Sequence, residues 1–113
     1  MSRDDLVLIV PCHNEATRLD SRAFLDFLAA RPDVRVILVD DGSTDGTWGL
    51  LERLASAEPE RIELVRLPAN SGKGEAVRLG MLQAFQSRPR LVGFWDADLA
   101  TPLDAVDDFL ALL

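Results

Sequence analysis

Four short apolar runs, separated by amphipathic helical patterns, constrain the fold of this chain more than any other feature. The first two runs are nearly continuous Val, Ile and Leu, which is typical of strands covered on both faces by helices. Regular alternation of strand and helix with short links implies a parallel sheet with right-handed crossovers. The predicted strands are Leu6 to Val10, Val34 to Val39, Ile62 to Leu67 and Leu91 to Trp95. We therefore predict an α/β fold with a Rossmann-like sheet of four mostly parallel strands.

The first three predicted helices have recognisable stop signals. Ser21 to Ala30 ends before Pro32, and Thr47 to Ala57 ends before Pro59. The third helix runs from about Lys73 to Ser87. Its predicted buried face consists of Ala76, Val77, Gly80, Met81, Ala84 and Phe85.

The third strand and the last helix carry two further signals. Glu63 and Arg66 interrupt the third apolar run, so this strand is predicted to lie at a sheet edge. Thr101-Pro102 predicts the start of a fourth helix, with proline at the first helical position. Its inward residues are expected to be Leu103, Val106, Leu110 and Leu113.

Length and composition limit the class of protein. At 113 residues, the chain is expected to be a single domain, residues 1–113. A net charge of −7 argues against nucleic acid as a partner, because binding a phosphate backbone requires clustered Lys and Arg. Cys12 is the single cysteine, which excludes an intrachain disulfide. The sequence has no apolar run of membrane-spanning length and no secretory signal, so we expect a cytoplasmic protein.

Two aspartates, Asp96 and Asp98, follow the fourth apolar run. Alternate side chains of an extended strand point the same way, so the two carboxylates could converge on one cation if the strand geometry persists to its end. Mg²⁺ or Mn²⁺ held by one or two carboxylates keeps positions for phosphate oxygens. Such a pair is a weak signal in a chain with thirteen aspartates, and its position at a strand end gives it value. We therefore predict a site for a nucleoside diphosphate.

Polar residues also follow the first and second runs, where an α/β sheet binds ligands. After the first run, Asn14 is either a turn residue or a ligand contact, and His13 is expected to be a loop or stacking residue. After the second run, adjacent Asp40 and Asp41 cannot both point into one core, so at least one should face the ligand. Thr47 is expected to cap the next helix.

Two glycines flank the single lysine just before the third helix. Gly72 and Gly74 around Lys73 are typical of a loop that approaches a phosphate, with backbone N–H groups and the helix N-terminus favouring an anion. The spacing matches neither the Walker A loop nor the dinucleotide motif. The alternative is a flexible helix start without a ligand.

Taken together, the four strand ends resemble the N-terminal half of family 2 glycosyltransferases, especially those with a dolichyl or polyprenyl phosphate acceptor. The motifs are Pro11-x-x-Asn14-Glu15, Asp40-Asp41-Gly42-Ser43-x-Asp45, Asn70-x-Gly72-Lys73-Gly74 and Asp96-Ala97-Asp98. Two positions depart from the family pattern. Ala100 stands where such relatives often carry glutamine, and His13 stands where an aromatic residue is usual.

The resemblance implies a GT-A fold and inverting transfer of a sugar from a nucleotide donor. It implies that Asp96 and Asp98 are the catalytic and metal-binding pair, with Mg²⁺ or Mn²⁺, and that Glu15 and Asp41 lie near the nucleoside. The candidate substrate-binding residues are Pro11, Asn14, Glu15, Asp40, Asp41, Gly72, Lys73 and Asp96. The acceptor would be a lipid phosphate, placing the protein at the cytoplasmic face of a membrane.

Two other classes of protein share some of these features. A phosphoacceptor signalling domain also carries clustered aspartates and a lysine, but its acidic pair should follow the first strand. A regulatory module that binds a nucleotide without catalysis fits the same residues. The last helix has no C-terminal stop signal, so we expect the chain to be one half of a longer enzyme. Its bare surface should then lead either to a homodimer that covers it or to low stability.

Overall fold

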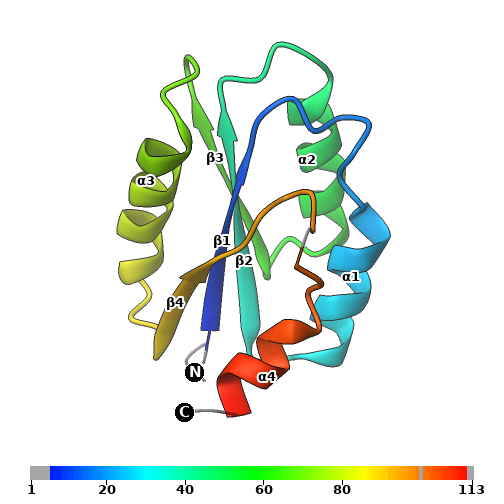
Figure 1. The fold of residues 1–113 in the computed structure, drawn as a ribbon, viewed down its shortest axis with the longest axis vertical. Coiled ribbons are helices and arrows are strands. Elements are labelled where there is room, and N and C mark those ends of the chain that lie inside the picture. The colour runs from blue at the N-terminus through cyan, green and yellow to red at the C-terminus, as the bar shows by residue number, and fades with distance from the viewer. Residues whose placement is uncertain (1–5, 100, 112–113) are drawn as a thin grey trace.

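The structure, a computed structural model, describes residues 6–99 and 101–111 and the side chains of all these residues except 109 and 110. Strands and helices alternate throughout, as predicted. Their order is β1 (Leu6–Cys12), α1 (Ser21–Ala30), β2 (Val34–Asp41), α2 (Thr47–Ala57), β3 (Ile62–Leu67), α3 (Lys73–Phe85), β4 (Leu91–Phe94) and α4 (Ala105–Ala111). The strands form one parallel sheet in the order β3-β2-β1-β4 (Figure 1). The α/β prediction is confirmed.

Each face of the sheet buries its own apolar core, because successive strand residues point to opposite sides. Leu6, Leu8 and Val10 of β1 belong to the core under α1, α2 and α4. Val7 and Ile9 belong to the core under α3, which lies alone on the other face in Figure 1. The central strands β1 and β2 are therefore covered on both sides, which explains their continuous apolar sequences.

Small residues let α3 approach the sheet closely. Ala76, Gly80 and Ala84 are its buried residues, spaced four apart on one stripe. A Cβ atom built at Gly80 would lie 2.5 Å from Ile9 Cγ2, so even alanine would force a shift there. The buried stripe of α3 is narrower than predicted. Phe85 is 57% exposed, and its predicted place on the buried face is wrong.

The sheet has β3 at one edge and β4 at the other, and exposed apolar side chains gather at the β4 edge. The predicted edge position of the third strand is confirmed, since β3 pairs only with β2 among the described strands. The strand β4 forms the opposite edge beside β1. Apolar side chains are exposed along β4 and the neighbouring α3, and they are Leu82, Phe85, Leu91 and Phe94.

The last helix begins three residues later than the prolyl signal predicted. Pro102 precedes a turn in which its carbonyl accepts from Ala105 N at 3.0 Å, and α4 starts at Ala105. The prediction of proline at the first helical position is therefore wrong, because the chain first makes a turn with i to i+3 bonds. Leu103 and Val106 are buried as predicted. The predicted inward side chains of Leu110 and Leu113 lie outside the described part of the structure.

Candidate functional site

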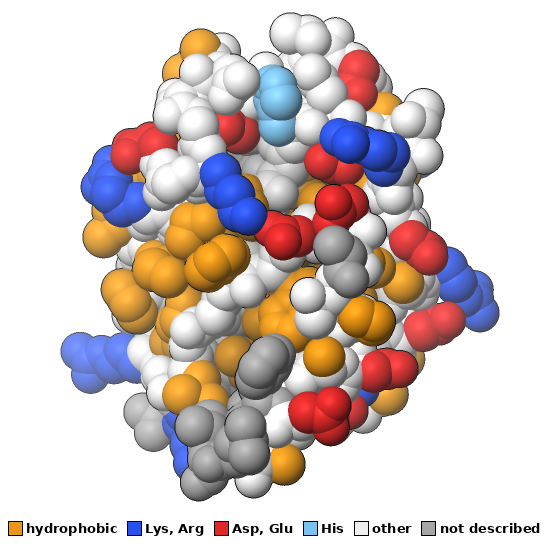
Figure 2. Space-filling view, viewed as in Figure 1, with side chains coloured by type: hydrophobic (Ala, Val, Ile, Leu, Met, Phe, Trp, Pro, Cys, Tyr) orange, Lys and Arg blue, Asp and Glu red, His pale blue; other side chains and the backbone are white. Residues whose placement is uncertain are grey.

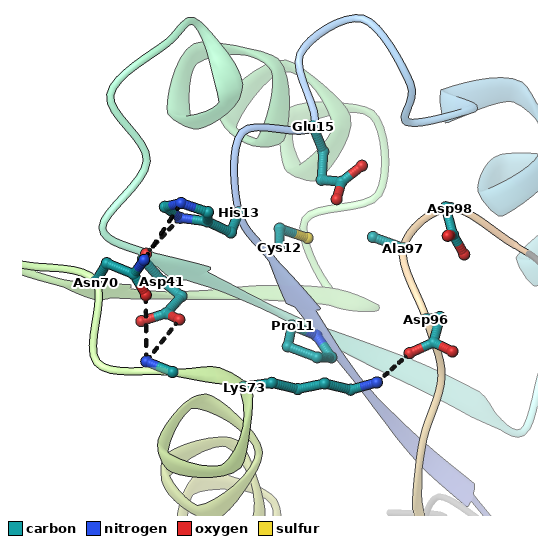
Figure 3. Close-up of a pocket in the computed structure, with 11 residues that line it drawn as sticks. Pro11, Cys12, His13, Glu15, Asp41, Asn70, Lys73, Asp96, Ala97 and Asp98 are labelled. Atoms are coloured by element: carbon teal, nitrogen blue, oxygen red, sulfur yellow. Dashed lines mark hydrogen bonds and ion pairs between the residues drawn. The ribbon is translucent and has the colours of Figure 1, made fainter.

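A cavity of about 290 Å³ lies beyond the carboxyl ends of β1, β2 and β4, where a parallel sheet is expected to bind its ligand (Figure 3). It brings together residues from all four predicted strand ends. Its lining consists of Pro11, Cys12, His13, Glu15, Asp41, Asn70, Gly72, Lys73, Asp96, Ala97 and Asp98. Seven of these are among the nine site residues predicted from the sequence. Of the other two, Asn14 lines a neighbouring cavity and Asp40 lines neither cavity.

The strand β2 continues through both adjacent aspartates, which sequence reasoning placed after it. Asp41 lines the cavity, whereas Asp40 is fully buried beside it. The Asp40 carboxylate accepts from Ser43 N at 3.1 Å and lies 3.8 Å from Arg66 Nε. Its contacts are therefore with the turn after β2 and with the edge strand β3.

Asp41 holds the glycine-containing loop against the sheet. Its two carboxylate oxygens accept from Ser71 N at 2.7 Å and from Gly72 N at 3.0 Å. One of the two interpretations of the sequence gave the N–H groups of this loop to a phosphate, but these two N–H groups donate to Asp41. These two hydrogen bonds fix the loop after β3 against the Asp41 carboxylate at this wall of the cavity.

Gly42 allows the turn after β2 to touch this same loop. Its φ is +64°, in the left-handed region that favours glycine. A Cβ atom built there would lie 2.2 Å from Asn70 N and 2.3 Å from Ala69 C, both backbone atoms. The absent side chain thus permits close contact between the turn after β2 and the loop after β3.

The loop after β1 is tied to the loop after β2 by side-chain hydrogen bonds. Asn14 N donates to Ser43 Oγ at 3.0 Å, and Asn14 Oδ1 accepts from Thr44 N at 2.9 Å. His13 Nδ1 lies 2.9 Å from the carbonyl oxygen of Asp41. Asn14 therefore joins two loops, which is the turn role that the sequence left open for it.

Thr47 and Asp45 position Glu15 from the start of α2. Asp45 Oδ1 accepts from Thr47 N at 2.9 Å, so Asp45 satisfies the helix start and the predicted capping role of Thr47 is wrong. The pKa of Asp45 is lowered by its hydrogen bond with the Thr47 hydroxyl group. Thr47 is fully buried, and its Oγ1 accepts from Glu15 N at 2.8 Å.

Glu15 presents an unpartnered acceptor to the cavity. Its Oε1 accepts from Arg18 at 3.1 Å, whereas its Oε2 is buried and has no hydrogen-bond partner in the described structure. A buried oxygen without a partner is costly, and a donor from a ligand would remove that cost. This is the observation in the cavity that points most directly to a bound molecule with N–H or O–H groups.

Asp96 and Asp98 line the cavity in a way that differs from the predicted geometry. The strand β4 ends at Phe94, and Leu99 N donates to the Asp96 carbonyl at 3.1 Å, which closes a turn. Strand alternation therefore does not align the two carboxylates, and that premise is wrong. The turn places both of them on the same cavity instead, with buried Ala97 between them.

The ammonium group of Lys73 forms an ion pair with Asp96. Lys73 Nζ, at the start of α3, is 2.5 Å from Asp96 Oδ1, as the dashed line in Figure 3 shows. The carboxylate oxygens of Asp96 and Asp98 are the donors that Mg²⁺ and Mn²⁺ prefer, and Lys73 occupies one of them in this structure. No group of three or more His, Cys, Asp or Glu that could hold a metal occurs among the described residues. The pair fits a cation that takes its remaining ligands from a bound molecule and water.

Cys12 and Ala97 line the cavity but were not predicted as contacts. Both flank residues that the motifs identified, and small side chains carry no chemical signal in sequence. Burial, followed by the charges of Glu15 and Asp40, raises the pKa of the Cys12 thiol far above its ordinary range. The thiol is therefore protonated at neutral pH and forms part of the cavity wall.

Residues 7–113 match the family model described as Glycosyl transferase family 2. The chain belongs to this family. It is 39% identical over 112 residues to the dolichyl-phosphate beta-glucosyltransferase of Drosophila melanogaster, covering 91% of this chain and 33% of that relative. It is 32% identical over 113 residues to the polyprenol monophosphomannose synthase of Mycolicibacterium smegmatis, covering 89% and 40%. The chain thus spans about a third of the length of the curated relatives it matches.

Solved structures agree with the family assignment. The mannosyltransferase PcManGT from Pyrobaculum calidifontis, in complex with GDP-Man and Mn²⁺, superposes with a TM-score of 0.74 and 28% identity over 96% of this chain and 32% of that one. S. aureus TarS in complex with UDP gives a TM-score of 0.72 and 25% identity, covering 95% and 31%. The fold is that of the GT-A glycosyltransferases, as the resemblance implied. These matches do not favour the regulatory and phosphoacceptor alternatives.

Within the described residues, no helix combines the length and apolar character needed to cross a membrane.

Proposed function

We propose that this chain forms the donor-binding part of an inverting glycosyltransferase that uses a nucleotide sugar, a divalent cation and a polyprenyl phosphate acceptor. The observation that carries the proposal is the single cavity in which the unpartnered Glu15 Oε2 meets Asp41, Lys73 and the Asp96–Asp98 pair. One side of the cavity offers acceptors for a nucleoside, and another offers carboxylates for a cation.

The nucleoside is proposed to lie against β1 and β2. Glu15 Oε2 would accept a hydrogen bond from a ribose hydroxyl or a base N–H, which satisfies that buried oxygen. Asp41 keeps this wall in place through the loop at Ser71 and Gly72, while its oxygens retain lone pairs for the ligand. The similar structures include one with GDP-Man and one with UDP-GlcNAc, so the base stays open.

The diphosphate is proposed to lie between Lys73 and the turn that carries Asp96 and Asp98. These two carboxylates would hold Mg²⁺ or Mn²⁺, and a similar structure contains Mn²⁺ with its GDP-Man donor. A bound divalent cation stabilises the negative charge that develops on the leaving diphosphate. Asp96 and Asp98 thereby act on the reaction by fixing where that charge is neutralised.

The acceptor and the base are proposed to come from outside these residues. Relatives at 32% and 39% identity are named a polyprenol monophosphomannose synthase and a dolichyl-phosphate beta-glucosyltransferase, so a lipid phosphate is the proposed acceptor. We place it at the cytoplasmic face of a membrane as part of the same proposal. A phosphate nucleophile is already ionised at neutral pH and reduces the need for a general base. Residues 1–113 then serve as the donor-binding part of a longer enzyme, in line with their share of about a third of the relatives' length.

We also propose that the isolated chain forms a homodimer through the β4 edge. Figure 2 shows hydrophobic side chains gathered over α3 and β4 on the left of the view, and an open strand edge lies beside them. Phe85, at 57% exposure, is at the end of α3 on this surface. Light scattering over rising concentration is expected to show dimers that Phe85→Lys weakens and the exposed α2 control Glu52→Lys leaves unchanged. A monomeric parent protein at all concentrations would contradict this.

Glu15→Gln tests the donor site with little risk to the fold. The substitution keeps the shape of the side chain but removes one acceptor, so affinity for UDP or GDP with Mn²⁺ should fall about 2- to 10-fold. The thermal midpoint without ligand should stay near that of the parent, because the Glu15 backbone bond to Thr47 is retained. Thermal shifts measure both, since a ligand stabilises the folded state by mass action.

Sugar transfer to polyprenyl phosphate is the direct test of the activity. A protein extended to the length of its relatives should transfer sugar from a nucleotide donor with inverted anomeric configuration, which NMR of the product reveals. The 113-residue chain alone should bind the donor without comparable turnover. Absence of binding to every nucleoside diphosphate tested, with Mn²⁺ present, would overturn the proposed function.

A further inference from the structure

Lys73 occupies a special place in the cavity. It is the single lysine of the chain and the first residue of α3, directly after Gly72. Its Nζ lies 2.5 Å from Asp96 Oδ1 and 5.5 Å from the centre of the Phe94 ring. Figure 3 shows the side chain extended from α3 to the turn after β4. Lys73 thus links the start of α3 to the turn after β4, which carries Asp96, 23 residues further along the chain.

The Lys73 ammonium group partly offsets the negative charge of the cavity lining. Four carboxylates line the cavity, and they belong to Glu15, Asp41, Asp96 and Asp98. Lys73 is the sole Lys or Arg among the lining residues. An anionic ligand entering alone would meet strong like-charge repulsion, so cations must compensate this site before a diphosphate can bind.

A divalent cation and the Lys73 ammonium group compete for Asp96. Two cations cannot both contact one carboxylate oxygen closely without strong mutual repulsion. The lysine is able to move, since its side chain is 57% exposed and its four-carbon stem is flexible. A diphosphate at this wall would offer the displaced ammonium group a new anionic partner.

We propose that Lys73 couples cation binding to diphosphate binding: its ammonium group neutralises Asp96 when the donor is absent and moves to the diphosphate when donor and divalent cation bind together. This inference rests on the proposed function of the same cavity and adds a residue that couples the binding of the two ligands. The cation alone must displace Lys73 from Asp96 without compensation. With the diphosphate present, the displaced ammonium group regains a partner, so each ligand raises the affinity for the other.

Mn²⁺ titrations of the parent protein and Lys73→Gln, with and without UDP or GDP, test the proposal by electron paramagnetic resonance of free Mn²⁺. Lys73→Gln should bind Mn²⁺ alone about two- to five-fold more tightly, because an exposed ion pair no longer opposes it. Its affinity for the diphosphate at saturating Mn²⁺ should fall roughly ten-fold, because a charged hydrogen bond is lost. Lys73→Arg, which keeps the charge, should retain most of the coupling.

Arg78→Gln is the matched control on the same helix. Arg78 lies 2.5 Å from its own partner, Glu75, is 58% exposed and does not line the cavity. The substitution removes the same charge, so it reports on general electrostatic effects and on the stability of α3. It should leave both the Mn²⁺ affinity and the coupling within about two-fold of the parent values.

The outcomes separate this inference from the function beneath it. Equal Mn²⁺ affinity and equal coupling in the parent protein and Lys73→Gln would overturn the role of Lys73 while leaving the donor site intact. A change of the same size in Arg78→Gln would also overturn it, because the effect would then be non-specific. If UDP and GDP fail to alter Mn²⁺ binding in the parent protein, the proposed function itself is wrong.

Discussion

Replacing Asp98 by alanine is expected to remove the diphosphate-dependent part of Mn²⁺ binding almost completely. Asp96 alone would then supply the protein's carboxylate to the cation, and Lys73 already competes for it. Loss of partners that merely orient metal ligands costs about 10- to 100-fold, so loss of a direct ligand should cost roughly 100-fold or more. Sugar transfer by the extended enzyme should fall at least as far, because the charge on the leaving diphosphate loses its stabilisation.

Calorimetric titration of Mn²⁺ into protein saturated with UDP or GDP measures this effect. Asp104→Ala is a suitable control, since its carboxylate is also exposed in the turn before α4 and pairs with Arg31 at 3.4 Å, outside the cavity. The control should bind Mn²⁺ and diphosphate like the parent protein. An Asp98→Ala protein with unchanged Mn²⁺ binding would remove Asp98 from the metal site.

The order of helices and strands was predictable because local patterns determine it. Prolines and amphipathic spacing fixed the ends of α1 and α2, and continuous Val, Ile and Leu identified the central strands. The ends of the first two strands were predicted too early, whereas the fourth strand ends one residue before the predicted Trp95. Cys12 and Asp40 extend β1 and β2 because they face each other in the ladder, and such pairing depends on residues far apart in sequence.

The contents of the site were more predictable than its internal bonds. Motifs at the strand ends identified Glu15, Asp41, Lys73 and the two aspartates as neighbours, because parallel strands deliver their carboxyl ends to one edge. The bond from Asp41 to the loop after β3 and the pairing of Lys73 with Asp96 had no local signal. Both join side chains from different loops, and only tertiary packing sets those distances.

Gly42→Ala is expected to disrupt the fold and the cavity together. A methyl group at this position would lie 2.2 Å from Asn70 N, and the φ of +64° disfavours alanine even without that contact. Because the obstructing atoms are backbone, they cannot rotate away, and the loop after β3 must move off the turn after β2. Strain of about 1 to 3 kcal/mol and overpacking of about 1 to 3 kcal/mol would together remove a large part of the free energy of unfolding.

The displaced loop contains the N–H groups that hold Asp41, so nucleotide affinity should fall with stability. Urea denaturation of Gly42→Ala and of Gly49→Ala separates this effect from the general response to alanine. Gly49 lies inside α2, where a Cβ atom meets nothing closer than Arg53 Nη1 at 3.6 Å, and alanine there should stabilise the helix by up to about 1 kcal/mol. A Gly42→Ala protein as stable as the parent would show that the loop after β3 can move without cost. Asp41 would then bind the nucleotide without the support that its two backbone donors provide.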